Sequence, residues 1–469
     1  MRVRHFGNTA NNAFHNVMLL RRFEAIESEL PISMFGLGHA MSAPAWETVD
    51  FDVPAAAWVS APDWALFPDG VSVNSEYTDI AAPSVLGAGL DAHLRPDRFP
   101  RFMSMIRRRV LPRMRGHRWA QPVFDLRDLQ MLARRHPLPE PDKQINLVYG
   151  GDSLAWLKLP KTALRTVCLE HGTVRWLADG GADARPLRLA YRRQLQQSQH
   201  LWVTNLDPRT LEVAEDVMPG RWSVLPHPFM PDPRVPFTES TRREMLLDAT
   251  RSRSLVLLPS SQNWSKQHDK GSIKALNAFI DLRRSGVDVG LVAVEWGLQL
   301  EESKELLKSA GVGDHVAWIP PMARFGLQRM MADVDLVWDQ FGLDAFGALA
   351  LRATEQGTPL VSRGLVPAGE QLIGGSVPWL HAAETSEIVR HTRDVLEDMT
   401  ARGREVVIVE TRERYRRWLL GRHSPRITGA LQRELYEALL DGGSARGTAR
   451  PGRWGELLVD GISDERTIR

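Results

Sequence analysis

Residues 335–363 hold the pattern that most constrains how this chain folds. A short apolar run is followed by a glycine-punctuated loop at residues 342–347, a helical pattern at residues 348–356 and a second strand-like run at residues 360–362. Strand, loop, helix and strand in this order form the repeating unit of a parallel α/β sheet. The loop leads into a helix N-terminus, where free N–H groups and the helix dipole favour anions. We therefore expect a phosphate-bearing ligand here, with Asp344 contacting its neutral part.

The same alternation recurs along the chain and predicts two α/β domains. A segment at residues 226–236, with five prolines in eleven positions, has the composition of an interdomain linker. The domains then cover residues 1–225 and 237–425, and the Gly- and Arg-rich residues 442–469 are expected to be poorly ordered. The expected strands lie at residues 3–6, 145–149, 166–169, 201–204, 254–258, 289–294, 316–319 and 336–338.

Composition narrows the class of protein. A chain of 469 residues is too long for one ordinary core, and its 43% hydrophobic and 25% charged residues are typical of a globular protein. No apolar run approaches the roughly 20 residues of a membrane helix, and the N-terminus lacks the apolar core of a signal peptide. The single cysteine, Cys168, fits a reducing compartment and a packing role on an apolar strand. We expect a cytoplasmic protein, and the excess of arginine over lysine fits a GC-rich bacterial genome.

The local distribution of charge says more about possible partners than the net charge does. The net charge of +2 gives no nucleic-acid signature, so no nucleic-acid partner is expected. Residues 98–118 contain eight arginines and no acid, with apolar residues at near-helical spacing. Such a helix could use Arg107, Arg108 and Arg109 to contact an acidic acceptor or the inner membrane face. A surface helix packed on its apolar stripe is an equal alternative, and Pro112 would interrupt either.

Two Asp-x-Asp pairs have the spacing of a metal–nucleotide site. They are Asp50 with Asp52 and Asp333 with Asp335. The second pair brackets the turn between a helical pattern and an apolar run, so turn chemistry explains it. We therefore expect neither a metal nor a cofactor.

The run DAFGALALRATEQGTPLV, at residues 344–361, and the turn Lys270-Gly271 stand out in the second half of the chain. The run lies over a motif of two glutamates separated by seven residues, and in this it resembles the retaining glycosyltransferases of the GT-B fold, family four. Asp344 falls on the first acid, Phe346-Gly347 on the motif's Phe-Gly, and Arg352 on the second acid. Lys270-Gly271 matches the family's Lys-Gly turn.

The first half resembles the same family more weakly. His171 matches the histidine at a strand end of the N-terminal domain, and Gly7-Asn8 matches the N-terminal glycine turn. The resemblance spans most of residues 1–441. It implies two Rossmann-like domains facing across a cleft, with a helix at residues 426–441 returning to the N-terminal domain.

The resemblance also implies an activity. It is the transfer of a sugar from a nucleoside-diphosphate sugar to an acceptor hydroxyl, with retention and without an enzymic nucleophile. The acceptor would be a glycan, a lipid-linked sugar or a small molecule in polysaccharide or glycoconjugate biosynthesis. A non-catalytic GT-B protein that binds a glycan or a partner glycosyltransferase is the alternative, and a sugar-nucleotide epimerase is a third hypothesis.

Each matched residue has a physical role under this interpretation. Lys270 would offset the charge that the leaving diphosphate gains, assisted by the N–H groups of Phe346, Gly347 and Ala348. Lys266 precedes the same helix and is an alternative cation. The resemblance places Asp344 on the donor sugar and His171 near the reacting centre.

Arg352 departs from the family pattern. The family's second glutamate binds the donor ribose, whereas arginine has only donors. Glu355 lies one helical turn later and could pair with Arg352 at i,i+3. Either Glu355 substitutes for the missing acid, or the donor is handled differently, or the site has lost catalysis.

Overall fold

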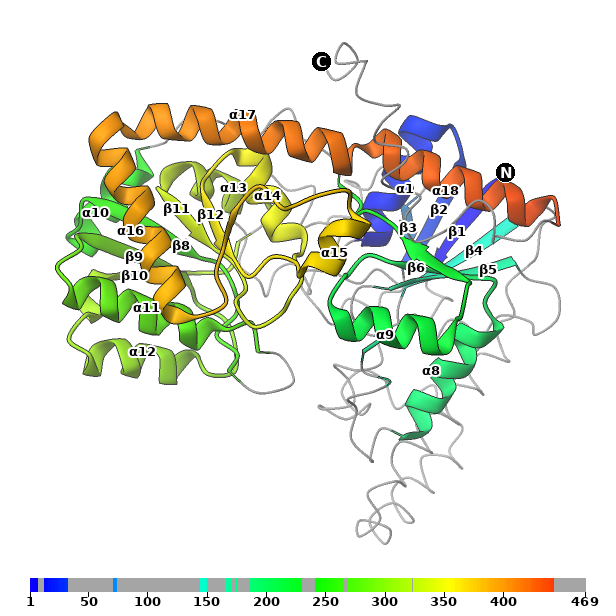
Figure 1. Ribbon diagram of the computed structural model, residues 1–469, viewed down its shortest axis with the longest axis horizontal. Helices are drawn as coiled ribbons and strands as arrows, with labels where there is room; N and C mark the ends of the chain where they lie inside the picture. The colour runs from blue at the N-terminus through cyan, green and yellow to red at the C-terminus, as the bar shows by residue number, and fades with distance from the viewer. Residues whose placement is uncertain are drawn as a thin grey trace, which may run out of the picture.

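The protein contains two parallel α/β sheets with helices packed on their faces (Figure 1). This architecture confirms the predicted pair of Rossmann-like domains. The computed structural model describes residues 1–6, 12–32, 71–73, 144–149, 165–170, 174–175, 177, 185–229, 241–264, 269–322 and 324–442. The predicted linker is described only up to Phe229, and the predicted tail only at residue 442.

The described strands of the N-terminal half form a seven-stranded sheet in the order β3-β2-β1-β4-β5-β6-β7. All its neighbouring strands pair in parallel. The elements are β1 (Arg2–Phe6), α1 (Asn12–Glu24), β2 (Glu27–Ile32), β3 (Val71–Val73), β4 (Gln144–Tyr149), β5 (Arg165–Glu170), α8 (Arg185–Gln197), β6 (His200–Val203), α9 (Pro208–Val217) and β7 (Trp222–Val224).

The described strands of the C-terminal half form a six-stranded parallel sheet in the order β10-β9-β8-β11-β12-β13. Its elements are α10 (Arg242–Thr250), β8 (Ser254–Leu258), α11 (Ser272–Arg284), β9 (Val289–Val294), α12 (Leu300–Ser309), β10 (Val316–Ile319), α13 (Arg324–Asp333), β11 (Leu336–Trp338), α14 (Ala348–Gln356), β12 (Leu360–Ser362), α15 (Pro367–Leu372), β13 (Leu380–His381) and α16 (Thr385–Arg402).

The central strand β8 is apolar on both faces because helices cover both sides of the sheet. Leu255 and Leu257 are fully buried in a core that includes side chains of α13 and α14. Val256 and Leu258 are fully buried in a second core formed with α11 and α16. Alternate residues of one strand therefore hold two helix layers, which fixes the sheet between them.

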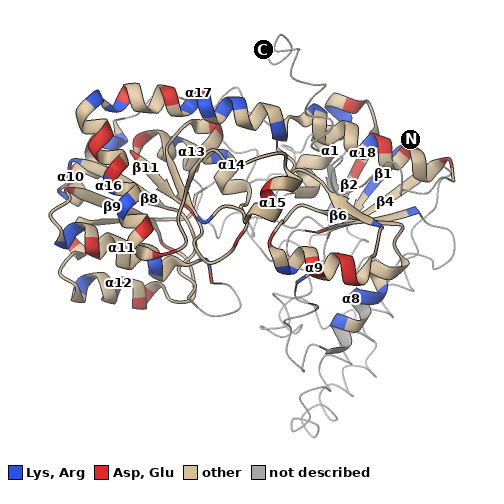
Figure 2. Cartoon of the chain, viewed as in Figure 1, with Lys and Arg blue, Asp and Glu red and all other residues tan. Residues whose placement is uncertain are grey.

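Two long C-terminal helices join the domains. α17 (Arg404–His423) runs along the C-terminal domain and α18 (Pro425–Leu440) continues over the N-terminal domain (Figure 1). The acidic residues of α17 all lie in its first half, and its second half carries only basic charges (Figure 2). Pro425 occupies the first turn of α18, which separates the two helices at Ser424.

α18 is bound to the N-terminal domain by polar contacts as well as by packing. The Gln432 amide donates to Asn16 Oδ1 at 3.0 Å, and Arg433 Nε lies 2.6 Å from Glu24 Oε2. Arg165 Nε donates to the carbonyl oxygen of Leu439 at 3.0 Å. These contacts confirm the predicted return of the last helix to the N-terminal domain.

None of the helices in the described ranges is long and apolar enough to cross a membrane. Cys168 is buried on β5, as predicted, with its Sγ 3.1 Å from Ser198 Oγ. Burial raises the pKa of this thiol to about 12, so the side chain is a packing residue.

Asp335 anchors the amino end of the second sheet. Its carboxylate lies 2.9 Å from Arg243 Nη2 and 2.7 Å from Arg404 Nε, and it accepts the Leu255 N–H at 2.8 Å. Only 3% of its side chain is exposed. One buried carboxylate therefore ties α10, α17 and β8 to the start of β11, at the sheet end opposite to the edge that binds ligands in such folds.

We expect Asp335→Ala to lower the free energy of unfolding by about 3 to 5 kcal/mol, because two mostly buried guanidinium groups lose their counter-charge. Urea denaturation followed by circular dichroism measures this loss. The control is Asp398→Ala, which removes an exposed carboxylate 3.2 Å from Arg402. That control should cost less than about 1 kcal/mol, and equal losses in the two variants would contradict the role of Asp335.

Candidate functional site

The strand order of the C-terminal sheet locates the candidate site. Counted outward from β8, the chain first winds through β9 and β10 and then reverses to β11, β12 and β13. The loops after β8 and β11 therefore leave in opposite directions at their carboxyl ends, and open α/β sheets bind ligands at this switch point. Lys270 comes from the first loop, and the stretch 339–347 forms the second.

Main-chain contacts hold these two loops together. The carbonyl oxygen of Lys270 accepts the N–H of Phe341 at 2.7 Å and the N–H of Gly342 at 3.2 Å. Gly271 has a φ of +76°, and a Cβ there would lie 2.7 Å from Gly342 N. Its N–H donates to Asp269 Oδ1 at 2.6 Å. Only glycine permits this approach, so the predicted Lys-Gly turn has a steric cause.

The loop after β11 also holds the Lys270 side chain. Lys270 Nζ donates to Gln340 Oε1 at 3.0 Å, and Gln340 Nε2 donates to the carbonyl oxygen of Ala345. Lys270 is partly buried. Burial lowers the pKa of Lys270, the carboxylate of Asp339 raises it, and the positive charge of Arg175 lowers it.

Asp339 is the acid beside this lysine. Its side chain is buried, with Oδ1 3.4 Å from Ser260 Oγ. Burial raises the pKa of Asp339 to about 6, while Lys270, Ser260 and the backbone N–H of Gln340 oppose the rise. Near neutral pH the site therefore holds a cation whose counter-charge depends on pH.

The start of α14 directly follows the loop after β11. Gly347 is the N-cap residue, and within the described ranges no side chain caps the helix and no atom lies within 4 Å of the position a Cβ would take on Gly347. Ala348 is exposed. The Phe346 ring packs edge-on against Trp379 and Trp418, so its side chain is an anchor. Backbone N–H groups at a helix start of this kind suit an anion chemically.

Asp344 is paired with an arginine that the sequence did not single out. Arg363 Nε lies 2.6 Å from Asp344 Oδ1, and Arg363 Nη2 donates to Oδ2 at 3.0 Å. About a quarter of each side chain is exposed. Arg363 directly follows β12, and its N–H donates to the carbonyl oxygen of Gln340 at 3.0 Å. The carboxylate is thus oriented at the same edge of the sheet as Lys270.

Arg352 and Glu355 form the predicted i,i+3 pair. Arg352 Nη1 lies 3.1 Å from Glu355 Oε2, and both side chains are less than 10% exposed. Glu355 Oε2 also accepts Gln328 Nε2 at 2.7 Å. The Arg352 guanidinium stacks over Phe229, 4.6 Å from the ring centre. Phe229 belongs to the segment that leaves the N-terminal domain, so Arg352 lies at the junction of the domains, and a ribose contact by Glu355 stays a prediction.

The other predicted site residues lie outside the described residues. They are His171, Gly7, Asn8, Lys266, Arg107, Arg108 and Arg109. Four described residues of this region were not predicted: Asp339, Gln340, Arg363 and Arg175. The first three directly follow β11 or β12, and that position at a strand's carboxyl end was the signal available in the sequence.

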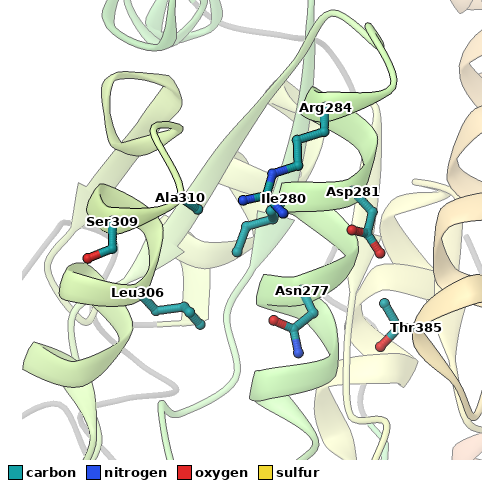
Figure 3. A pocket seen from close by; sticks show the side chains of 8 residues that line it. All are labelled: Asn277, Ile280, Asp281, Arg284, Leu306, Ser309, Ala310 and Thr385. Atoms are coloured by element: carbon teal, nitrogen blue, oxygen red, sulfur yellow. The ribbon is translucent and has the colours of Figure 1, made fainter.

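A separate hollow of about 510 Å³ lies between α11 and α12 (Figure 3). Asn277, Asp281 and Arg284 of α11 line one side, and Leu306 and Ser309 of α12 line another. These residues lie on a helix layer and not at the carboxyl ends of the strands. No residue of the predicted site lines this hollow.

No protein-family model matches this sequence, and no curated protein sequence matches it. Solved structures resemble the fold along nearly the whole chain. A structure of Anabaena Alr3699/HepE in complex with UDP and glucose has a TM-score of 0.55 at 11% identity, covering 93% of this chain and 100% of that one. Sucrose-phosphate synthase from Thermosynechococcus elongatus has a TM-score of 0.55 at 11% identity, covering 94% and 100%.

A glycosyltransferase from Rickettsia africae has a TM-score of 0.51 at 8% identity, covering 94% of this chain and 99% of that one. At these identities the likeness concerns the fold. Together with the two parallel sheets, it confirms the GT-B architecture expected from the sequence.

The acid beside Lys270 predicts a pH-dependent affinity for anions. As pH rises through about 6, Asp339 ionises and opposes an incoming anion, so pyrophosphate should bind more weakly. Isothermal titration on both sides of this pH measures the effect. Pyrophosphate itself titrates, so Asp339→Asn in the same buffers is the control and should show the smaller decrease. Identical pH profiles for the two proteins would count against Asp339.

Proposed function

We propose that this protein is a glycosyltransferase that moves a sugar from a nucleoside-diphosphate sugar to an acceptor hydroxyl, with retention. The observation that supports it most is that Lys270 is held, through Gln340 and Ala345, by the loop that leads into the uncapped N-terminus of α14 at the switch point of the C-terminal sheet. A cation and free backbone N–H groups at one sheet edge suit a diphosphate. We place the donor at this edge, between the two domains.

The proposed chemistry needs charge stabilisation at the leaving group. The bond between the anomeric carbon and the β-phosphate oxygen breaks, and its electron pair stays on that oxygen. The acceptor hydroxyl oxygen bonds to the anomeric carbon from the same side, and its proton passes to a phosphate oxygen. Lys270 and the N–H groups at Gly347 and Ala348 contact the oxygen that gains charge, so they stabilise the transition state more than the ground state.

The related structures support a nucleotide ligand. HepE, which shares this fold, has been seen with UDP and with UDP-glucose. UDP is therefore the first nucleotide to test on this chain. We further propose that the enzyme belongs to family four, transfers a hexosyl-type sugar and requires no metal.

Asp344 is proposed to bind the donor sugar. A carboxylate accepts hydrogen bonds from two sugar hydroxyls, and Arg363 already orients it with two contacts of 2.6 and 3.0 Å. A sugar at this place would add hydroxyl donors to the same carboxylate. His171, Gly7 and Asn8 remain proposed contacts near the reacting centre.

We also propose the acceptor class and the cell location. A glycan, a lipid-linked sugar or a small molecule would enter from the N-terminal domain of a cytoplasmic enzyme. Arg107, Arg108 and Arg109 are the proposed contacts to an anionic membrane surface. We expect replacement of all three by glutamine to reduce flotation with anionic liposomes, and unchanged flotation would contradict the membrane contact.

A second function is favoured by Arg352. Where a ribose-binding acid is expected, this chain carries a buried arginine paired with Glu355 and stacked on Phe229. A GT-B protein without turnover, which binds a glycan or a partner glycosyltransferase, would tolerate this change.

Nucleotide binding tests the proposed site. Isothermal titration with UDP, GDP and ADP should give one nucleoside diphosphate that binds, and Lys270→Ala should weaken it about tenfold to a hundredfold, because a charge-assisted contact is lost. Lys274→Ala is the matched control, since Lys274 lies in α11, which follows this turn, and its Nζ lies 2.9 Å from Glu384 Oε1. Absence of binding to every diphosphate would refute the proposal.

Turnover separates the two functions. We expect the nucleotide sugar that contains the bound nucleoside diphosphate to be consumed when an acceptor is present. NMR of the product should show the same anomeric configuration as the donor. Binding without turnover, against a broad set of acceptors, would favour the non-catalytic protein.

A further inference from the structure

The N-terminal domain contributes an arginine whose hydrogen-bonding capacity is not used within the described part of the chain. Arg175 follows the carboxyl end of β5, next to the buried Val174. Its Nη1 lies 3.6 Å from Asp207 Oδ2, which is too far for a hydrogen bond. Among the described residues this buried nitrogen has no hydrogen-bond partner.

Asp207 is already engaged elsewhere. It caps α9, with Oδ1 accepting the Thr210 N–H at 3.0 Å and Oδ2 accepting the Thr210 hydroxyl at 2.5 Å. Its side chain is 8% exposed, whereas that of Arg175 is 30% exposed. The carboxylate therefore has a structural role at the helix start, and it leaves guanidinium donors of Arg175 available.

This part of the N-terminal domain touches the C-terminal domain. A Cβ on Gly369 of α15 would lie 3.2 Å from the carbonyl oxygen of Leu206, just before the Asp207 cap. Figure 1 shows α15 beside the start of α9. The charge of Arg175 also reaches across this interface, since it lowers the pKa of Lys270 after the larger effects of burial and of Asp339.

Arg175 lies next to the contact between the two domains, and its charge acts on Lys270, whose neighbouring acid is Asp339. Like charges repel one another, and a buried N–H without an acceptor is unfavourable. A dianionic group between the two cations removes both penalties. The planar guanidinium can also donate two parallel hydrogen bonds to two phosphate oxygens, whereas an ammonium group lacks this geometry.

We propose that Arg175 binds the diphosphate of the donor from the N-terminal domain, opposite Lys270, and so holds the two domains together around the leaving group. The inference rests on the proposed function and adds a second cation from the other domain. Because Arg175 contacts the phosphates, it should contribute to the affinity for the diphosphate and not to the affinity for the nucleoside.

The test is isothermal titration with pyrophosphate, UDP and uridine against five proteins. They are the wild type, Arg175→Gln, Arg175→Lys, Lys270→Ala and Arg192→Gln. Arg192 is the matched control because it belongs to the same domain and pairs on the surface with Asp216 at 3.0 Å. Thermal unfolding midpoints check that the variants fold.

We expect Arg175→Gln to lower the affinity for pyrophosphate and for UDP about tenfold, because one charge-assisted contact is lost. The affinity for uridine should not change. Arg175→Lys should recover part of the affinity, because lysine keeps the positive charge but lacks the paired N–H donors of the guanidinium group. Arg192→Gln should bind as the wild type does.

The outcomes distinguish this inference from the proposed function. Wild-type affinity in Arg175→Gln, with affinity lost in Lys270→Ala, would overturn the role of Arg175 and leave the proposed function standing. Equal weakening of uridine and UDP would also overturn it, since the contact would not be to phosphate. Failure of the wild type to bind pyrophosphate and each of UDP, GDP and ADP would overturn both.

Discussion

The carbonyl oxygen of Lys270 is the point on which the candidate site depends. By accepting the N–H groups of Phe341 and Gly342, it fixes the loop after β8 against the loop after β11. The two loops lie so close that Gly271 and Gly342 have no room for side chains. From this contact the chain runs into α11 on one side and α14 on the other, so both helix starts are oriented by one main-chain atom.

The two ends of the C-terminal sheet differ in how completely their polar groups are satisfied. At the amino end, Asp335 receives Arg243, Arg404 and the Leu255 N–H, and the result is a closed cluster. At the carboxyl end, no side chain from the described ranges caps the start of α14. Buried polar groups are normally hydrogen-bonded, so the matched charges hold the amino end together, and the donors that remain at the carboxyl end are the ones a ligand could use.

Local pattern predicted the repeating unit well. The predicted helix at residues 348–356 and the strand at residues 360–362 are observed with the same bounds. β2 was missed because its sequence, ESELPI, alternates acidic residues and contains a proline, both unusual in strands.

The sequence singled out candidate site residues that belong to one loop, and it did not single out those whose position depends on neighbouring strands or domains. Lys270 was chosen from its turn, which is local. The partners Gln340 and Arg363 depend on strand order, and the approach of Arg175 depends on how the domains are oriented. Neither arrangement is encoded in the periodicity of a short segment.

The return of α18 has a consequence for the order in which the protein is made. A chain emerges from the ribosome N-terminus first, yet Asn16 and Glu24 of α1 have partners on the last described helix. These polar side chains of α1 therefore lack their partners until almost all the described residues have been synthesised. Division of the chain at the proline-rich segment would therefore leave the N-terminal domain without the helix that contacts α1.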